Sequence, residues 1–240
     1  MKWQTLFKAF LPTALGAFVC IASAHAGGPE RYASLKDAPY QQPAFSWTGA
    51  YVGVTAGYGW GESRFDDGAT SNPFDMDGVI AGGTIGYNFQ TRSNIVLGIE
   101  ADISYSDISG AFGPANLGQP NGGFWGCGSG PCVTEVTWFG TVRGRLGLAM
   151  DRVLFYATGG LAFGNIDSAI LNDPDWLTGN VTAGWTAGAG IEYALRPGWT
   201  AKLEYLHVDL GWTDRNAQAD FRSEAVFDVV RLGLNYHFKP

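Results

Sequence analysis

Charged side chains and cysteines are scarce in this sequence. Only 15% of its 240 residues are Asp, Glu, Lys or Arg, and there are three cysteines, whereas average chains are about one quarter charged. The net charge of −7 and the lack of a basic cluster disfavour nucleic-acid binding. After residue 26 there is no apolar run long enough for a membrane-spanning helix, which excludes a helical membrane protein.

Glycine and aromatic residues are abundant instead. The chain has 35 Gly, nine Trp, ten Tyr and 15 Phe, and 46% of its residues are hydrophobic. Apolar content this high can bury a core, which disfavours disorder. The composition therefore indicates an all-β chain.

The first 26 residues have the features of a secretory signal peptide. Two lysines flank the start of an apolar run over 9–22, and a small-x-small pattern ends at Ala26. We expect cleavage between Ala26 and Gly27; a membrane anchor is the weaker alternative, because the run is short and contains a proline. Residues 27–46 contain three prolines and show no periodicity, so we predict a periplasmic tether before a barrel over 47–240.

A two-residue period dominates the rest of the chain. Over 95–106, large apolar residues alternate with small, polar or charged ones, and the same period recurs over 48–62, 76–89, 134–149, 153–166, 180–195, 199–210 and 225–238. The connections 90–94, 150–152 and 196–198 are short, whereas 63–75, 107–133, 167–179 and 211–224 are long. This pattern predicts an eight-stranded antiparallel up-and-down transmembrane β-barrel. A soluble β-sandwich, the alternative, would expose charge rather than glycine on its second face.

The inward positions carry a balanced set of charges. Four acids face four bases there: Glu100, Asp102, Glu192 and Glu204 with Arg143, Arg145, Lys202 and Arg231. An eight-stranded barrel has room inside only for side chains, and an unpaired buried charge is costly. We therefore predict a barrel-interior charge network; a charged constriction for ion passage is the alternative.

The last apolar residues of 199–210 break this pattern. Leu206, Val208 and Leu210 are out of phase with Leu203 and Tyr205. We therefore predict a β-bulge near His207.

No catalytic or metal-binding motif is present in the sequence. His207 and His237, the histidines after residue 26, have no partners at metal-ligand spacing. His207 and Asp209 could serve a lipid-modifying site, but no serine is placed to act as a nucleophile. We expect no enzyme activity, no metal and no cofactor.

Two features fall in the predicted long loops. Cys127 and Cys132 lie five positions apart in an exported chain, which predicts a disulfide. Loops carry most recognition in such proteins, so Trp125, Trp176 and Trp212 are candidate loop contacts, for instance for haem.

Four segments carry a resemblance to a known family: residues 47–53, 138–147, 203–211 and 230–238. With them the chain resembles the outer membrane immunogenic proteins of alphaproteobacteria, whose barrel is similar to the transmembrane domain of OmpA. Family members typically end in an aromatic residue, whereas here Lys239 and Pro240 follow Phe238.

The resemblance implies a surface-exposed protein of the bacterial outer membrane. Its partners would be outer-membrane lipid and lipopolysaccharide, the barrel assembly machinery during insertion, and a host surface or haem. We predict a structural, non-catalytic barrel that contributes to envelope integrity and surface interaction. The alternative is a narrow pore or a barrel that binds a small ligand such as haem.

Overall fold

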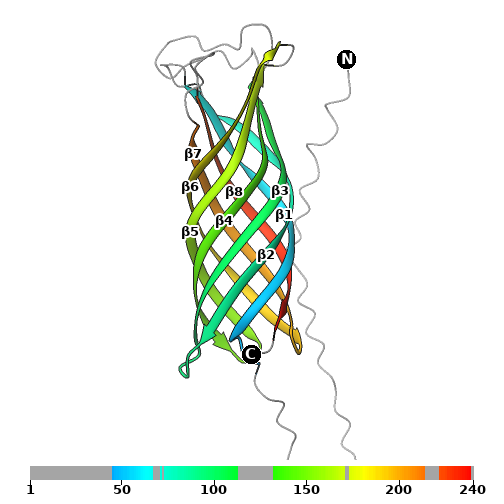
Figure 1. Ribbon diagram of the computed structural model, residues 1–240, viewed down its shortest axis with the longest axis vertical. Coiled ribbons are helices and arrows are strands. Elements are labelled where there is room, and N and C mark those ends of the chain that lie inside the picture. The colour runs from blue at the N-terminus through cyan, green and yellow to red at the C-terminus, as the bar shows by residue number, and fades with distance from the viewer. Residues whose placement is uncertain are drawn as a thin grey trace, which may run out of the picture. The chain divides into compact units, whose positions relative to one another are not determined.

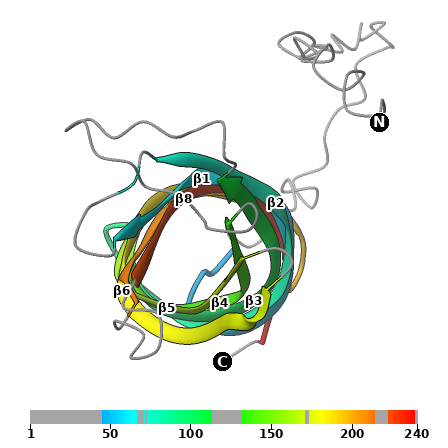
Figure 2. The same ribbon diagram turned by 90° about the horizontal axis from the view of Figure 1, so that it is seen from above.

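The chain folds into a closed barrel of eight antiparallel strands. The computed structural model describes residues 45–66, 71, 73–112, 132–170, 173–213 and 222–238. The strands are β1 (Gly49–Asp66), β2 (Phe74–Gln90), β3 (Ile95–Phe112), β4 (Cys132–Met150), β5 (Val153–Ile170), β6 (Asp173–Arg196), β7 (Trp199–Trp212) and β8 (Arg222–His237). Each pairs with its neighbours in sequence, and β1 pairs with β8 to close the ring (Figures 1 and 2). The predicted fold class is confirmed. Among the described residues, no helix is long and apolar enough to span a membrane.

Three tight turns define one end of the barrel, called the short-turn end below. They cover residues 91–94, 151–152 and 197–198. Asn94, Asp151 and Gly198 have φ angles of 61°, 51° and 79°, a backbone region that Asn, Asp and Gly enter at the lowest cost. The opposite end is called the long-loop end.

The strands reach further toward the long-loop end than the sequence predicts. The predicted loop over 167–179 is largely wrong: β5 continues to Ile170 and β6 starts at Asp173, with Asp167 opposite Gly179. β1, β3, β4 and β8 likewise extend into predicted loops. Ladder pairing satisfies backbone donors and acceptors in polar segments too, so the strands continue where the apolar alternation has stopped.

Side chains alternate between the two faces of the barrel throughout β7. Leu206, Val208 and Leu210 point inward and are fully buried, so the predicted bulge near His207 is wrong. The alternation is intact; what changes is the lumen, which becomes apolar at this level. The irregularity in the pairing of β7 with β8 lies between Asp209 and Trp212, where Gly211 has a φ of 68°.

Two apolar clusters occupy the lumen at different heights. The upper cluster, toward the long-loop end, combines buried side chains from six strands: Met76, Ile80, Ile108, Val136, Phe139, Ala162, Ile166, Leu206, Val208, Leu210, Ala225, Phe227 and Val229. The lower cluster, near the short-turn end, contains Trp47, Val96, Ala149, Leu154, Tyr156 and Ala194, with Phe45 packed against it. The charged side chains of the lumen lie between them.

Candidate functional site

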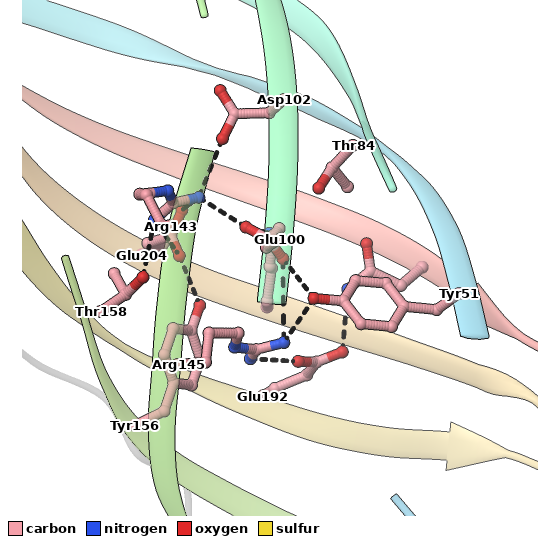
Figure 3. Close-up of polar contacts among 12 residues, drawn as sticks. Tyr51, Thr84, Glu100, Asp102, Arg143, Arg145, Tyr156, Thr158, Glu192 and Glu204 are labelled. Atoms are coloured by element: carbon pink, nitrogen blue, oxygen red, sulfur yellow. Dashed lines mark hydrogen bonds and ion pairs between the residues drawn. The ribbon is translucent and has the colours of Figure 1, made fainter. Parts of the chain in front are cut away.

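The eight predicted charged residues all lie inside the barrel, between the upper and lower clusters. They come from β3, β4, β6, β7 and β8, and each is at most 6% exposed. Figure 3 shows part of the arrangement, in which carboxylates and guanidinium groups from opposite walls meet. The structure thus brings the eight side chains into one network.

Arg143 on β4 is the most connected base. Its Nη2 donates to Glu100 Oε1 at 2.5 Å and to Asp102 Oδ2 at 2.9 Å, and its Nη1 donates to Glu204 Oε1 at 3.2 Å. Its Nε donates to Thr141 Oγ1 at 2.8 Å. One guanidinium therefore joins carboxylates from β3 and β7 across the lumen (Figure 3).

Arg231 and Lys202 hold the same carboxylates from the other side. Arg231 donates from Nε to Glu204 Oε2 at 2.7 Å and from Nη2 to Asp102 Oδ2 at 2.9 Å. Lys202 Nζ donates to both oxygens of Glu100, at 3.0 and 2.9 Å. Each of these three acids therefore contacts at least two bases.

A lower branch of the network is centred on Glu192. Arg145 Nη2 donates to Glu192 Oε2 at 2.7 Å. The other carboxylate oxygen accepts from Thr200 Oγ1 at 2.5 Å and from Asn235 Nδ2 at 2.8 Å, and lies 3.3 Å from His237 Nε2. Arg145 Nη1 also lies 3.7 Å from Glu100 Oε2, which joins the two branches.

Two tyrosines complete the network, and the sequence reasoning missed them. Tyr51 donates to Glu100 Oε2 at 2.7 Å, and Tyr156 donates to Glu204 Oε1 at 2.8 Å. Arg145 donates to the Tyr51 hydroxyl at 2.9 Å, and its Cζ lies 3.8 Å from the centre of the Tyr156 ring. Both tyrosines occupy the same alternate positions along their strands as the small inward residues. This position in the alternation could have identified them from the sequence.

Each tyrosine needs a glycine on the neighbouring strand. Gly86 is directly opposite Tyr51, and Gly190 is directly opposite Tyr156. A Cβ at either glycine would lie 2.4 Å from an atom of the tyrosine ring or hydroxyl, far inside van der Waals contact. Glycine at these two positions lets the rings lie flat against the wall and extend their hydroxyls toward the acids.

The network is balanced in charge and closed to solvent. Four carboxylates meet three guanidinium groups and one lysine side chain, and both Arg143 and Glu100 side chains are 0% exposed. Removing one member of a buried pair leaves an uncompensated charge, which costs about 3–5 kcal/mol. This arrangement is suited to bracing the barrel walls against one another.

Most of the remaining predicted site residues cannot be placed relative to this network. Ala26, Gly27, Trp125 and Cys127 lie outside the described residues, as do the side chains of Cys132 and Trp176.

Trp176 and Trp212 were predicted to lie in loops, and this is wrong. Trp176 belongs to β6, and Trp212 ends β7, where the Arg222 Cζ lies 4.8 Å from the centre of its ring. Continued strand pairing beyond the apolar segment accounts for both positions.

His207 points outward, away from the network. Its Nδ1 lies 2.8 Å from Asp228 Oδ1, and its ring centre lies 5.3 Å from that of Trp185. The hydrogen-bond partner is therefore Asp228 rather than Asp209, which accepts from Trp185 Nε1. Across the part of the chain that the structure describes, no group of three or more His, Cys, Asp or Glu side chains could hold a metal ion.

Comparison with known proteins identifies the family. The family model described as "Outer membrane protein beta-barrel domain" matches residues 13–238. The chain belongs to this outer-membrane β-barrel family. The 31 kDa outer-membrane immunogenic protein of Brucella melitensis is 38% identical over 228 residues, which cover 85% of this chain and 90% of that protein. The 22 kDa outer membrane protein of Rhizobium leguminosarum is 30% identical over 206 residues, covering 85% and 83%. Neisserial surface protein A, a solved structure, has a TM-score of 0.44 and 11% identity, covering 80% of this chain and 98% of that one.

Family membership places the barrel in the bacterial outer membrane and confirms the resemblance to outer-membrane immunogenic proteins. Barrels of this kind have short periplasmic turns and longer extracellular connections. The short-turn end is therefore periplasmic and the long-loop end extracellular. The outward apolar residues, such as Val54 (64% exposed) and Ile99 (58% exposed), face lipid.

Proposed function

We propose that this outer-membrane β-barrel protein is a structural, non-conducting barrel that contributes to envelope integrity and offers its extracellular end for surface contacts. The observation that carries the proposal is the position of the charge network between two apolar clusters. Catalysis has no part in this role.

The apolar clusters oppose ion passage. An ion crossing the barrel would have to leave water and pass the upper cluster, where Phe139, Leu206 and Phe227 are at most 1% exposed. Moving an ion into such an apolar region costs many kcal/mol. The charged residues below it have partners on several sides, so they are better explained as braces than as a selectivity filter.

The braces join parts of the barrel that are far apart in sequence. The bond from Arg231 to Asp102 spans 129 residues, and the bond from Lys202 to Glu100 spans 102. These contacts cross the lumen and join β3 to β7 and β8. Such links resist flattening and opening of the ring, which supports a mechanical role in the envelope.

The extracellular half offers surface for contacts. A tilted strand needs about 9–11 residues to cross the membrane, whereas β4 has 19 and β6 has 24. The excess extends the sheet beyond the extracellular side of the bilayer. This extension supports the second part of the proposal, contact with a host surface, lipopolysaccharide or another ligand.

A deletion strain complemented with two forms of the protein tests both parts. We expect the full chain to restore detergent resistance and antibody binding to intact cells. A form whose four extracellular extensions are replaced by short turns should restore detergent resistance but lose antibody binding and adhesion. If the trimmed, correctly assembled form restores every property, the extensions are only spacers. The pore alternative has a separate test: a steady current through the full-length protein in a planar bilayer would support a narrow pore.

A further inference from the structure

The lipid-facing surface of the described strands carries an apolar groove over β3 to β7. Its volume is about 790 Å³. Ala157 and Ala189, directly opposite each other on β5 and β6, form its floor. Larger residues surround them: Leu146 and Phe155 on one side, Ile191, Leu203 and Tyr205 on the other. The groove is therefore a depression with an alanine floor and aliphatic and aromatic walls.

Neighbouring glycines on the same face keep the surface around the groove low. Gly144, Gly159 and Ala187 are opposite one another on three successive strands. A Cβ added at Gly144 or Gly159 would meet no atom closer than 3.5 Å. Packing within the barrel therefore does not require glycine here, unlike at Gly190. A molecule outside the barrel can account for the small residues.

The groove lies at the depth of one leaflet. Ala157 is five residues from Arg152 in the β4–β5 turn, which is about 16 Å along the strand. At a strand tilt of about 40° this is about 13 Å along the barrel axis. Half of the hydrocarbon core is about 15 Å thick, so the groove spans the acyl region of the periplasmic leaflet.

Positive charge is concentrated at the same end of the barrel. The tight turns and their edges contain Arg92, Arg152 and Arg196, with Asp151 as the acid among them, and all four are exposed. Arg152 precedes β5 and Arg196 ends β6, the two strands that carry the floor of the groove. The Arg152 carbonyl accepts from Ala194 N at 2.8 Å, which holds that turn against β6, and the Arg196 Cζ lies 5.3 Å from the Trp199 ring centre.

The extracellular half has the opposite charge. Its outward strand positions carry Glu62, Asp75, Asp77, Asp209, Glu224 and Asp228, offset by Arg64 and Arg222. A phosphate would be repelled there and attracted to the short-turn end. The charge asymmetry therefore sets the direction in which a charged lipid would lie along the groove.

We propose that this groove is a binding site for an anionic phospholipid of the periplasmic leaflet. One acyl chain lies on the floor formed by Ala157 and Ala189, and the phosphate pairs with Arg152 and Arg196, since guanidinium groups bind phosphate in a bidentate manner. The inference depends on the outer-membrane location and is independent of the proposed function.

A second copy of the chain fits this site less well. Two copies in the same membrane orientation would bring the arginines of both short-turn ends to the same depth, where they repel each other. The phosphate of an anionic lipid instead carries the opposite charge. The charge of the rim thus selects a lipid over a protein partner.

Native mass spectrometry of the purified protein, released from micelles that contain equal amounts of phosphatidylglycerol and phosphatidylcholine, tests the proposal. We expect the protein to retain phosphatidylglycerol preferentially. Each of Arg152→Ala and Arg196→Ala should lower this preference about fivefold, because a basic residue near an anionic lipid surface contributes about 1 kcal/mol. Both positions are in exposed turns, so the variants should fold, which heat-dependent gel mobility verifies.

A matched pair of double variants tests the groove itself. Ala157→Leu with Ala189→Leu fills the floor and should abolish phosphatidylglycerol retention. Ala56→Leu with Ala81→Leu adds the same volume at an outward pair that is directly opposite on β1 and β2, and should leave retention unchanged. Equal retention of the two lipids by the unmodified protein, equal losses in the two double variants, or lipid-free dimers would each overturn the proposal.

Discussion

Replacing Arg143 by methionine should destabilise the barrel more than replacing any exposed base. Arg143 contacts three carboxylates, at 2.5 Å (Glu100), 2.9 Å (Asp102) and 3.2 Å (Glu204). Its removal leaves four buried acids facing three basic side chains. Breaking a buried pair in this way costs about 3–5 kcal/mol. Each acid keeps another partner, Arg231 or Lys202 among them, so we expect a value toward the lower end of that range.

The control is Arg64→Met on β1. The Arg64 guanidinium is 3.6 Å from Glu62 and 4.0 Å from Glu224, and its side chain is 45% exposed. An exposed ion pair contributes at most about 1 kcal/mol, so this variant should remain close to the unmodified protein. The size of the difference between the two variants measures the effect of burial.

Unfolding by guanidinium chloride in lipid vesicles, followed by tryptophan fluorescence, measures both variants. Linear extrapolation converts the transition into a free energy. A double variant, Arg143→Met with Glu204→Gln, restores the charge balance and should recover part of the loss, since neighbouring sites couple by about 0.5–3 kcal/mol. Equal unfolding transitions for Arg143→Met and Arg64→Met would refute the bracing argument. So would a double variant whose loss of unfolding free energy equals the sum of the losses in the two single variants.

Three further predictions concern other parts of the chain. The purified protein should begin at Gly27 and migrate differently on a gel before and after boiling, because a closed barrel has no free strand edge for detergent to attack; N-terminal sequencing and gel mobility check this. Cys127 and Cys132 should resist maleimide labelling until a reductant is added, because the disulfide that we predict between them would leave no free thiol to react. Phe139→Ala with Leu206→Ala should create a cavity in the upper cluster and raise bilayer conductance above the zero expected for the unmodified protein; no current from either form would show that the lower cluster alone seals the lumen.

The charged lumen was predictable because alternation along a strand does not depend on how the strands are staggered. An error of one residue in the alternation would have moved every side chain to the other face of the sheet. Such an error would place the large apolar residues inside the barrel, where they do not fit. The same rule failed at Leu206 and Val208, because apolar residues were assumed to point outward. The assumption holds only where the lumen is polar, and here the lumen changes character along its axis.

The pairing within the network could be predicted only in part. Glu100 with Arg143, and Glu204 with Arg231, are directly opposite on neighbouring strands and do form ion pairs. Glu192 and Lys202 are directly opposite on β6 and β7, so neighbouring-strand reasoning would join them. The Lys202 ammonium instead lies 2.9 Å from Glu100 across the lumen, and Glu192 binds Arg145. Contacts across the lumen depend on strand tilt and stagger, which are properties of the closed ring and are not encoded in any one strand.

The placement of the fourth base has a consequence for how the protein is made. Arg231 lies on β8, the last strand to leave the ribosome, whereas Asp102 and Glu204 lie on β3 and β7. Arg231 is directly opposite Glu204 in the β7–β8 pair, so this contact can form before β8 joins β1. Its contact with Asp102 on β3 crosses the lumen instead and needs the closed ring. The same guanidinium therefore serves two stages of assembly, first the β7–β8 hairpin and then the closed barrel.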